Sequence, residues 1–459
     1  MSNENDRDSE TPKTPSRRGF LTAAGIAFAG TTLGAGAASE ARAATGDQAT
    51  TGNAAAEPFW GEHQGGILTR PQSHTYFAAF DLTTDKRDDV ITLLKTWTQA
   101  AARMSKGLPI EPFKESEIAP PTDMSTTTTV TTADYADAKP TLVALTDSSE
   151  SLELPPARLT VTFGFGAGLF VKDGEDRFGL AKHRPEAFVD LPRFVGDQLV
   201  EAHTGGDLSV QACADDPQVA FHAVRQLARL AYDFAGIRWT QSGFIPNFGP
   251  KRTPRNLMGF KDGTNNPSVA DAEAMAKIVW VGEEGPDWMR GGSYLVARRI
   301  RIAIEHWDRT NVPFQEQTVG RHKLSGAPLG KAHEFDAADY GATDKDGNSV
   351  IPENAHIRLA APVNNDGAQI LRRPYSFNDG VNFTAERWPP WRQGNEYDAG
   401  LFFLAYQRDA RTGFIKIFDR MAKFDMMNQF VTHVGGGFFA IPRGAKEGEY
   451  IGQKLFEST

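Results

Sequence analysis

The sequence predicts an α+β protein built from two units with antiparallel sheets. The first observation is a length of 459 residues, which is too long for one ordinary core and suits two domains with a leader and some loops. The second is a composition of 40% hydrophobic and 23% charged residues, which is the profile of a globular protein. The third is the order of strand and helix patterns, which is similar in the two halves of the chain.

The first half shows strand, helix, strand, strand, helix and strand patterns, in that order. They fall at residues 75–82, 86–104, 159–165, 207–212, 216–232 and 237–244. Apolar periodicity marks these segments, and Asp216-Pro217 marks the start of the second helix. This is the order of a ferredoxin-like split unit, so we expect such a domain over residues 67–248.

The second half repeats this order loosely. Strands or extended segments are predicted at 293–302, 357–360, 370–375, 400–407 and 437–441, and helical segments at 305–308, 315–319 and 413–427. We therefore expect a second ferredoxin-like domain over residues 249–459, packed against the first. The Thr-rich span 118–140 and the run 331–353 show no core pattern and are predicted to be surface excursions.

The first 43 residues have the features of an export signal. The hexapeptide SRRGFL at 16–21 precedes a weakly apolar stretch, and Ala41-Arg42-Ala43 places small residues before a cleavage point at Ala44. Paired arginines followed by Phe-Leu resemble the twin-arginine consensus. We expect export by the twin-arginine translocase to the periplasm, the cell surface or the medium, with residues 44–66 as a linker.

Charge and cysteine content exclude several classes of protein. A formal net charge of −9 gives no basic footprint for nucleic acid. Cys213 is the single cysteine, which rules out a disulfide framework, a cysteine-based zinc site and an iron–sulfur cluster within one chain. No stretch after the leader is long and apolar enough to span a bilayer. Any metal chemistry must therefore rest on histidines and carboxylates.

Three local patterns are candidates for chemistry. GFKDGTNNP at 259–267 places an acid between glycines, which suits a close approach to a flat ligand and equally suits an ordinary Asp-Gly turn. HIRLA at 356–360 offers one histidine, enough for an axial haem ligand but also typical of a structural residue. LFFL at 401–404 is apolar enough to wall a macrocycle or to be a core strand.

Taken together, the motifs resemble the dye-decolourising haem peroxidases. GFKDGT, GRHK with APLG, HIRLA, LRRPYS and GLFFLAYQRD occur here in the order seen in that family, and the resemblance runs from about Gly65 to the C-terminus. It is greatest to the exported branch that includes the iron-transport-associated peroxidase, also described as a deferrochelatase. The resemblance implies two ferredoxin-like units of the dimeric α+β barrel type, with one haem b in the C-terminal unit.

The resemblance also assigns roles to individual residues. It makes Asp262 the distal acid and His356 the proximal haem ligand. The distal arginine falls on Arg372, with Arg373 as the alternative because the two are adjacent. His322 and His433 are other histidines that could bind the iron, although neither lies in the matching motif. The distal pocket would be lined by Leu401 and Phe403, and Gly263 would contact the cofactor. Asp425 is the candidate carboxylate that orients the proximal imidazole.

These roles imply a reaction with hydrogen peroxide and an organic one-electron donor such as a dye or a phenol. Asp262 would move the peroxide proton, and Arg372 would stabilise the charge that develops as the O–O bond breaks. One alternative is a deferrochelatase that releases iron from haem, and another is a non-catalytic haem carrier, which would need neither Asp262 nor Arg372. A cofactor-free structural protein and the homo-oligomeric state are further open points.

Overall fold

The computed structural model describes residues 55–112, 146–246, 252–385 and 393–457. The predicted export signal, the Thr-rich span 118–140 and residues 44–54 of the predicted linker lie outside the described residues. The part of the linker that is described, residues 55–66, lies against the rest of the fold. There the buried Gln64 amide donates hydrogen bonds to the carbonyl oxygens of Phe163 (3.0 Å) and Pro442 (2.9 Å).

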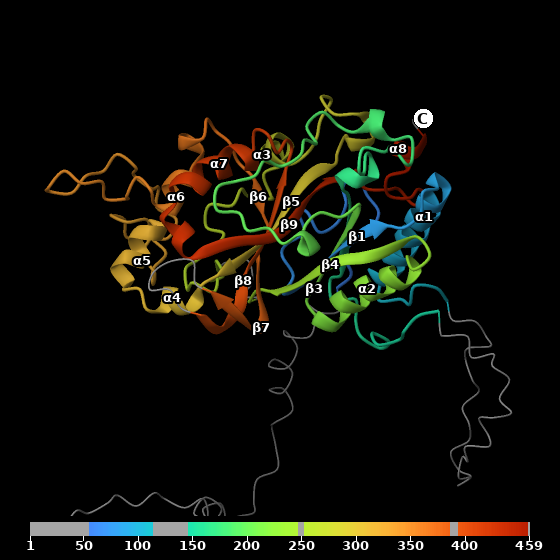
Figure 1. Cartoon of the computed structure of the whole chain (residues 1–459), viewed down its shortest axis with the longest axis horizontal. Coiled ribbons are helices and arrows are strands. Elements are labelled where there is room, and N and C mark those ends of the chain that lie inside the picture. The colour runs from blue at the N-terminus through green and yellow to red at the C-terminus, as the bar shows by residue number, and fades with distance from the viewer. Residues whose placement is uncertain (1–54, 113–145, 247–251, 386–392, 458–459) are drawn as a thin grey trace, which may run out of the picture. The chain divides into compact units, whose positions relative to one another are not determined.

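The N-terminal half contains the predicted strands and helices in the predicted order (Figure 1). They are β1 (His74–Leu82), α1 (Arg87–Met104), β2 (Thr160–Phe165), β3 (Leu208–Ala214), α2 (Pro217–Leu230) and β4 (Ala235–Phe244). Helix α2 begins where the sequence indicates, because the Asp216 carboxylate caps it by accepting from the backbone N–H groups of Gln218 and Val219. Proline at the first helical position fixes the dihedral that the helix needs.

The C-terminal half has more short helices than expected. Its elements are α3 (Ala272–Ile278), β5 (Ser293–Ile302), α4 (Ile304–Asp308), α5 (Val312–Val319), α6 (His356–Ala360), β6 (Leu371–Arg372), β7 (Tyr375–Ala385), β8 (Gln393–Gln407), α7 (Phe414–Phe424), β9 (Val431–Ile441) and α8 (Gln453–Glu457). The extended segment predicted at 357–360 is wrong. Those residues are helical, since the backbone N–H of Leu359 donates to the carbonyl of Ala355 (3.1 Å).

Eight strands of the described residues close into a ring in which every neighbouring pair is antiparallel. The N-terminal half contributes the order β2-β3-β1-β4 and the C-terminal half the order β9-β5-β8-β7. The two halves meet at single residue pairs, Phe165 with Ala440 and Phe244 with Ser376. The short strand β6 pairs with β8 beside the ring. The fold is therefore α+β with a closed, barrel-like antiparallel sheet, as the predicted class requires.

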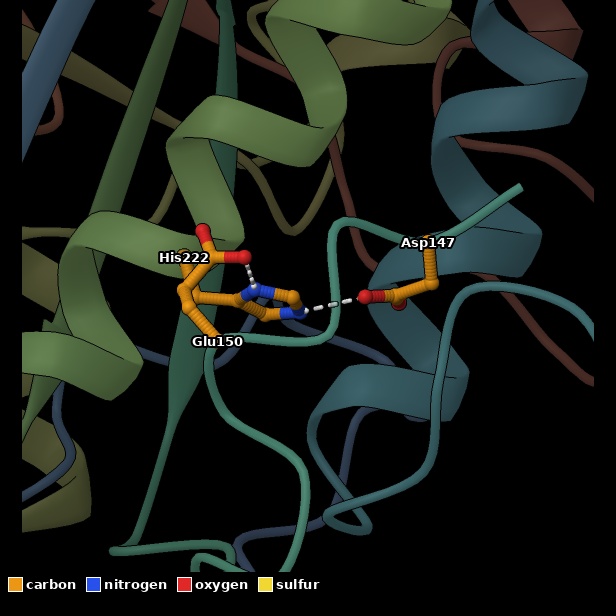
Figure 2. Close-up of side chains that lie close together, drawn as sticks. All are labelled: Asp147, Glu150 and His222. Atoms are coloured by element: carbon orange, nitrogen blue, oxygen red, sulfur yellow. Dashed lines mark ion pairs between the residues drawn. The ribbon is translucent and has the colours of Figure 1, made fainter. Parts of the chain in front are cut away.

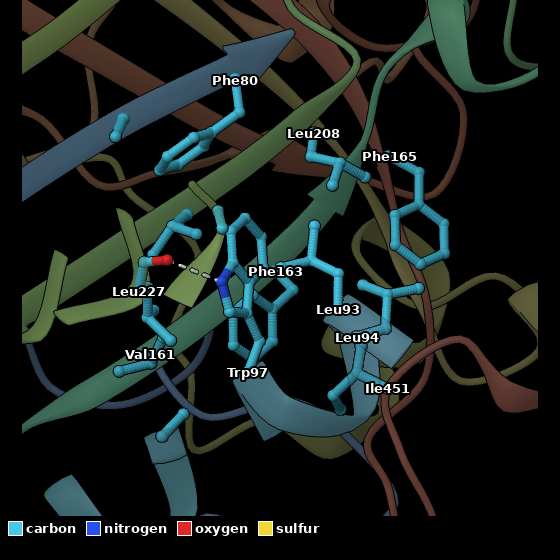
Figure 3. Close-up of a cluster of buried hydrophobic side chains, with 14 of the residues drawn as sticks. Phe80, Leu93, Leu94, Trp97, Val161, Phe163, Phe165, Leu208, Leu227 and Ile451 are labelled. Atoms are coloured by element: carbon cyan, nitrogen blue, oxygen red, sulfur yellow. Dashed lines mark hydrogen bonds between the residues drawn. The ribbon is translucent and has the colours of Figure 1, made fainter. Parts of the chain in front are cut away.

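Buried aromatic residues hold both halves together. In the N-terminal half, Trp97 of α1 stacks on Phe163 of β2 at 5.7 Å between ring centroids, and its indole N–H donates to the carbonyl of Leu227 (2.8 Å) (Figure 3). A second cluster links the halves, since Phe77 of β1 lies 5.4 Å from Phe402 of β8 and 5.9 Å from Phe439 of β9. The strands of the two halves thus share one packed apolar core.

The strands β5 and β8 present a second apolar surface, which is not used by that core. Ile300 and Ile302 of β5 and Leu401 and Phe403 of β8 alternate with the core residues of the same strands and line a cavity instead. Helices α6 and α7 lie in contact with each other and also contribute to its wall. No helix of the described ranges is long and apolar enough to cross a membrane.

Candidate active site

A cavity of about 260 Å³ lies in the C-terminal half, and residues between 256 and 433 line it. Its wall is largely apolar and includes side chains from β5, β8 and α7. Polar side chains interrupt this wall, among them Asp262, Arg372 and His356. Gly263, Leu401, Phe403 and Asp425 line the same cavity. The structure thus brings the seven residues to which the resemblance assigned a role to one place, although they span more than 160 positions of the chain.

Asp262 is held in a tight loop that precedes α3. Its backbone N–H donates to the carbonyl of Pro254 (2.9 Å), and the flanking Gly259 and Gly263 have φ values of 84° and 122°. Residues with a Cβ rarely adopt such angles, which explains why glycines flank the acid. The Asp262 carboxylate accepts a hydrogen bond of 2.6 Å from the Arg372 guanidinium, and 15% of its side chain is exposed. The acid is therefore paired and oriented.

The structure separates the two adjacent arginines. Arg372 lines the cavity and pairs with Asp262, whereas Arg373 is buried and donates to the carbonyl of Thr69 and the side chain of Gln72. Asn266 ties the loop that carries Asp262 to the backbone of Arg372. Its side-chain oxygen accepts from the Arg372 N–H (2.9 Å), and its side-chain nitrogen donates to the Arg372 carbonyl (2.8 Å). Of these two arginines, Arg372 is therefore the one placed to act with Asp262.

His356 lies at the first position of α6, with its ring facing the cavity. Its Nδ1 lies 2.7 Å from a carboxylate oxygen of Asp425, which follows α7 and has only 2% of its side chain exposed. The other oxygen of Asp425 accepts from the Met427 N–H (2.8 Å), so the carboxylate is fixed. The His356 Nε2 has no hydrogen-bond partner among the described residues, and 34% of the side chain is accessible because it borders the cavity.

The neighbouring carboxylate determines the pKa of His356 and which of its ring nitrogens is available to a ligand. Burial lowers the pKa of His356, but the adjacent Asp425 carboxylate outweighs burial and raises the pKa above its ordinary value. The hydrogen bond on Nδ1 also leaves Nε2 as the nitrogen directed at a ligand. An imidazole anchored in this way by a carboxylate is the arrangement that metal-binding histidines use.

The two alternative histidines differ in their surroundings. His322 is not part of the cavity wall and lies 3.0 Å from Glu316, with 42% of its side chain exposed. His433 does line the cavity, but its Nδ1 is buried without a hydrogen-bond partner. Burial, together with the charge of Arg298, lowers the pKa of His433 to about 3. Because no carboxylate anchors either ring from inside the cavity wall, His356 is the better candidate ligand.

Sequence reasoning missed several residues that lie beside the site. Asn266, Lys261 and Thr264 lie in the quoted motif, yet no role was assigned to them. Glu334 lies in the run predicted to be a surface excursion, and its carboxylate accepts from Thr264 (3.0 Å) and from Lys261. The signal in the sequence that could have found one of them is Asn266, which lies between Asp262 and a proline. A side-chain amide can donate to a backbone carbonyl and accept from a backbone N–H at the same time.

A separate group of charged side chains lies in the N-terminal half. Asp147, Glu150 and His222 approach one another closely enough to be considered as metal ligands (Figure 2). However, the two carboxylates lie beside different ring nitrogens, with Asp147 3.6 Å from Nε2 and Glu150 3.2 Å from Nδ1. This geometry fits a protonated imidazole bridging two acids rather than three ligands around one ion.

Fold and cavity together define the class: an α+β protein with an apolar pocket, an imidazole that a carboxylate anchors, and a paired acid and arginine. Comparison with known proteins gives the family. Residues 64–245 match the Dyp-type peroxidase N-terminal family, and residues 253–446 match the Dyp-type peroxidase C-terminal family. The chain therefore belongs to the Dyp-type peroxidases, which are haem peroxidases, and the resemblance found in the sequence is confirmed.

Individual relatives agree with this assignment. A deferrochelatase of Escherichia coli is 35% identical and covers 96% of this chain and 97% of its own length. A dye-decolorizing peroxidase of Thermobifida fusca is 35% identical, with 97% and 98% covered. Among solved structures, a DyP-type peroxidase of Streptomyces coelicolor is similar with a TM-score of 0.75 at 36% identity, covering 90% of this chain and 100% of that one. One from Cellulomonas bogoriensis gives 0.73 at 35%, with 88% and 99% covered.

Haem is the cofactor of this family, and the residues present fit it. The apolar wall suits a flat macrocycle, and the unpartnered Nε2 of His356 is a donor of the kind that haem iron takes in the axial position.

Proposed function

We propose that this chain reduces hydrogen peroxide at a haem bound in the cavity of its C-terminal half and oxidises dyes, phenolics or other one-electron donors. The observation that carries the proposal is that the Asp262–Arg372 pair and the His356–Asp425 pair open onto one cavity. A protein that only stored haem would need the second pair alone. Haem bound there supplies the electron transfer from the donor to peroxide.

Each residue then has a task that its geometry suits. Asp262 accepts a proton from peroxide and returns it to the departing oxygen, since a carboxylate can do both in turn. Arg372 orients Asp262 through the 2.6 Å hydrogen bond and stabilises negative charge as the O–O bond breaks. His356 would hold the iron through Nε2, and Asp425 would increase the basicity of that nitrogen. Gly263, Leu401 and Phe403 would border the macrocycle and exclude water.

The strand orders support a further part of the proposal. Each half of the ring has the first strand at the centre beside the third, with the fourth and second outside, and helices between them. This is the order of the ferredoxin-like split unit, so we infer two such units with the haem in the second. All residues of the cavity wall belong to the C-terminal half, which agrees with that location.

Release of iron from haem is a second candidate function. It is favoured by the deferrochelatase of Escherichia coli, which is as similar to this chain as the dye-decolorizing peroxidase. Both reactions would use the same cavity. They are distinguished by their products, because iron release leaves intact iron-free protoporphyrin, whereas peroxidase turnover leaves the haem bound and oxidises the donor.

We also propose that the chain is exported by the twin-arginine translocase. The support is the SRRGFL segment at 16–21 with its following apolar stretch and small-residue cleavage point. Replacement of Arg17 and Arg18 by lysine is expected to leave full-length, haem-loaded protein inside the cell. If this variant is exported and shortened as efficiently as wild type, the proposal is wrong.

The decisive experiment records the absorption spectrum of the haem-loaded protein before and after one equivalent of hydrogen peroxide. Wild type should change its spectrum rapidly, His356→Ala should lose haem or its axial ligation, and Asp262→Ala should bind haem but react slowly. His322→Ala is a matched control outside the cavity and should behave as wild type. Haem binding that is indifferent to His356, or a peroxide reaction that is indifferent to Asp262, contradicts the assignment of the site.

A further inference from the structure

The run of residues 331–354, named here the brace, connects the two sides of the cavity. At one end, Glu334 accepts hydrogen bonds from the loop that carries Asp262. At the other end, the Tyr340 hydroxyl donates to the carbonyl of Ile357 (3.2 Å) in α6, and the Asn354 carbonyl accepts from the Met426 N–H (3.1 Å). The brace thus contacts the segments that carry the acid, the histidine and its carboxylate partner, although it contains neither helix nor strand.

Glu334 is the part of the brace that bears on the acid. Its carboxylate accepts from the Lys261 ammonium and from the Thr264 hydroxyl (3.0 Å), which flank Asp262 in the sequence. Its side chain is only 10% exposed, and its backbone carbonyl accepts from the buried Arg321 (3.0 Å). Both the side chain and the backbone of Glu334 are therefore fixed.

Glu334 is charged in this environment. Burial raises the pKa of Glu334, but the hydrogen bonds from Lys261, Thr253 and Thr264 and the lysine charge outweigh it and hold the pKa below its ordinary value. The carboxylate thereby neutralises the ammonium of Lys261, which lines the cavity next to Asp262. Without that partner, a free ammonium would compete with Arg372 for the Asp262 carboxylate, because unlike charges in a partly buried wall attract strongly.

We propose that Glu334 is a positioning residue for Asp262: by pairing with Lys261 and Thr264 it keeps the acid on Arg372 and directed at the cavity. This inference rests on the proposed role of Asp262 in the peroxide reaction. In this inference, Lys261 would compete with Arg372 for the Asp262 carboxylate if Glu334 did not bind its ammonium. The removal of Lys261 should therefore make Glu334 dispensable.

The test compares Glu334→Gln, Lys261→Met and the double variant Glu334→Gln/Lys261→Met in the haem-loaded protein. Glutamine preserves the shape and can still accept from Thr264, so the negative charge and the acceptor for Lys261 are lost together. We expect Glu334→Gln to slow the reaction with peroxide about tenfold, as a displaced catalytic group does. The double variant should return to near the wild-type rate. Glu284→Gln, which breaks an exposed ion pair with Arg408 outside the cavity wall, is the matched control and should change nothing.

An equilibrium measurement accompanies the rates. Cyanide binds to ferric haem as an anion after losing a proton, so its dissociation constant, read from the ferric spectrum, reports the distal acid without turnover. It should rise several-fold in Glu334→Gln and return in the double variant. Haem content and the thermal unfolding midpoint identify a variant that has not folded. In that case Lys261→Met alone decides, since the inference requires it to keep the wild-type rate and cyanide affinity.

The outcomes separate this inference from the proposed function. If Asp262→Ala reacts with peroxide as fast as wild type, the proposed function is wrong. If Asp262→Ala is slow while Glu334→Gln matches wild type, the inference about Glu334 is wrong and the proposed function stands. If Lys261→Met fails to restore Glu334→Gln, Glu334 has a structural role only and the inference is likewise overturned.

Discussion

The hydrogen bond between His356 and Asp425 should set the reduction potential of the bound haem. In Asp425→Asn the contact at 2.7 Å can persist, because the amide oxygen still accepts from Nδ1, but the negative charge is lost. The amide nitrogen then takes the place of the oxygen that accepts from the Met427 N–H, so this second hydrogen bond is lost, and the thermal unfolding midpoint measures that separate effect. At the imidazole itself, the perturbation is the loss of the negative charge.

The size of the shift in reduction potential is estimated from the difference between a charged and a neutral hydrogen bond to His356. A hydrogen bond to a charged group contributes about 1.5–3 kcal/mol and a neutral one about 0.5–1.5 kcal/mol. The difference is on the order of 1.4 kcal/mol, which corresponds to about 59 mV for one electron. Because only 2% of the Asp425 side chain is exposed, solvent screens this charge little. Loss of a negative charge disfavours the ferric state, so the potential should rise by roughly 60 mV.

The assay is a spectroelectrochemical titration of the haem-loaded variant beside wild type. Asp419→Asn is the matched control, because Asp419 lies on the same helix α7 in an exposed pair with Lys423 and should leave the potential unchanged. If Asp425→Asn binds haem with an unchanged potential, or if Asp419→Asn shifts it equally, Asp425 does not act on the iron through His356 and the reasoning is refuted.

Two further predictions concern the stability of the N-terminal half. Burial lowers the pKa of His222, but Asp147 and Glu150 outweigh it and raise the pKa above its ordinary 6.5, while the pKa of Asp147 falls to about 2 (Figure 2). The stabilisation is therefore full between pH 3.8, the ordinary pKa of Asp147, and pH 6.5. It is lost as the pH rises through the raised pKa of His222 or falls through the lowered pKa of Asp147. His222→Gln should lower the thermal midpoint at pH 5.5 and much less at pH 9, and a deficit that grows with pH would contradict this. Trp97→Ala should lower the free energy of unfolding in urea by about 3–5 kcal/mol, since Trp97 is 1% exposed. The control Tyr232→Ala, at a residue that is 86% exposed, should change this free energy little. Equal effects of the two substitutions would refute the packing argument.

The sequence by itself determined the family, the α+β class and the motifs that carry the candidate site. Apolar alternation located β1, β5 and α1 to within one residue at each end, because burial on one face imposes a period that local sequence records. GFKDGT, HIRLA and LRRPYS placed Asp262, His356 and an arginine pair in the right neighbourhoods, since glycine-flanked acids and isolated histidines are local features.

Other features depended on contacts between distant segments. The choice between Arg372 and Arg373 was open, because successive residues of an extended segment face opposite sides and the sequence does not say which side holds the cavity. The helix at 356–360 was missed, because five residues are too short to show a helical period.

The partners of the site residues were the least predictable feature. Asp425 lies 69 positions from His356, and Glu334 lies 73 from Lys261 in a run without any periodic pattern. The sequence supplies the charged groups, but their pairing depends on how α6, α7 and the brace pack around the cavity. Only the tertiary structure decided these contacts, since side chains that meet through packing leave no regular spacing along the chain.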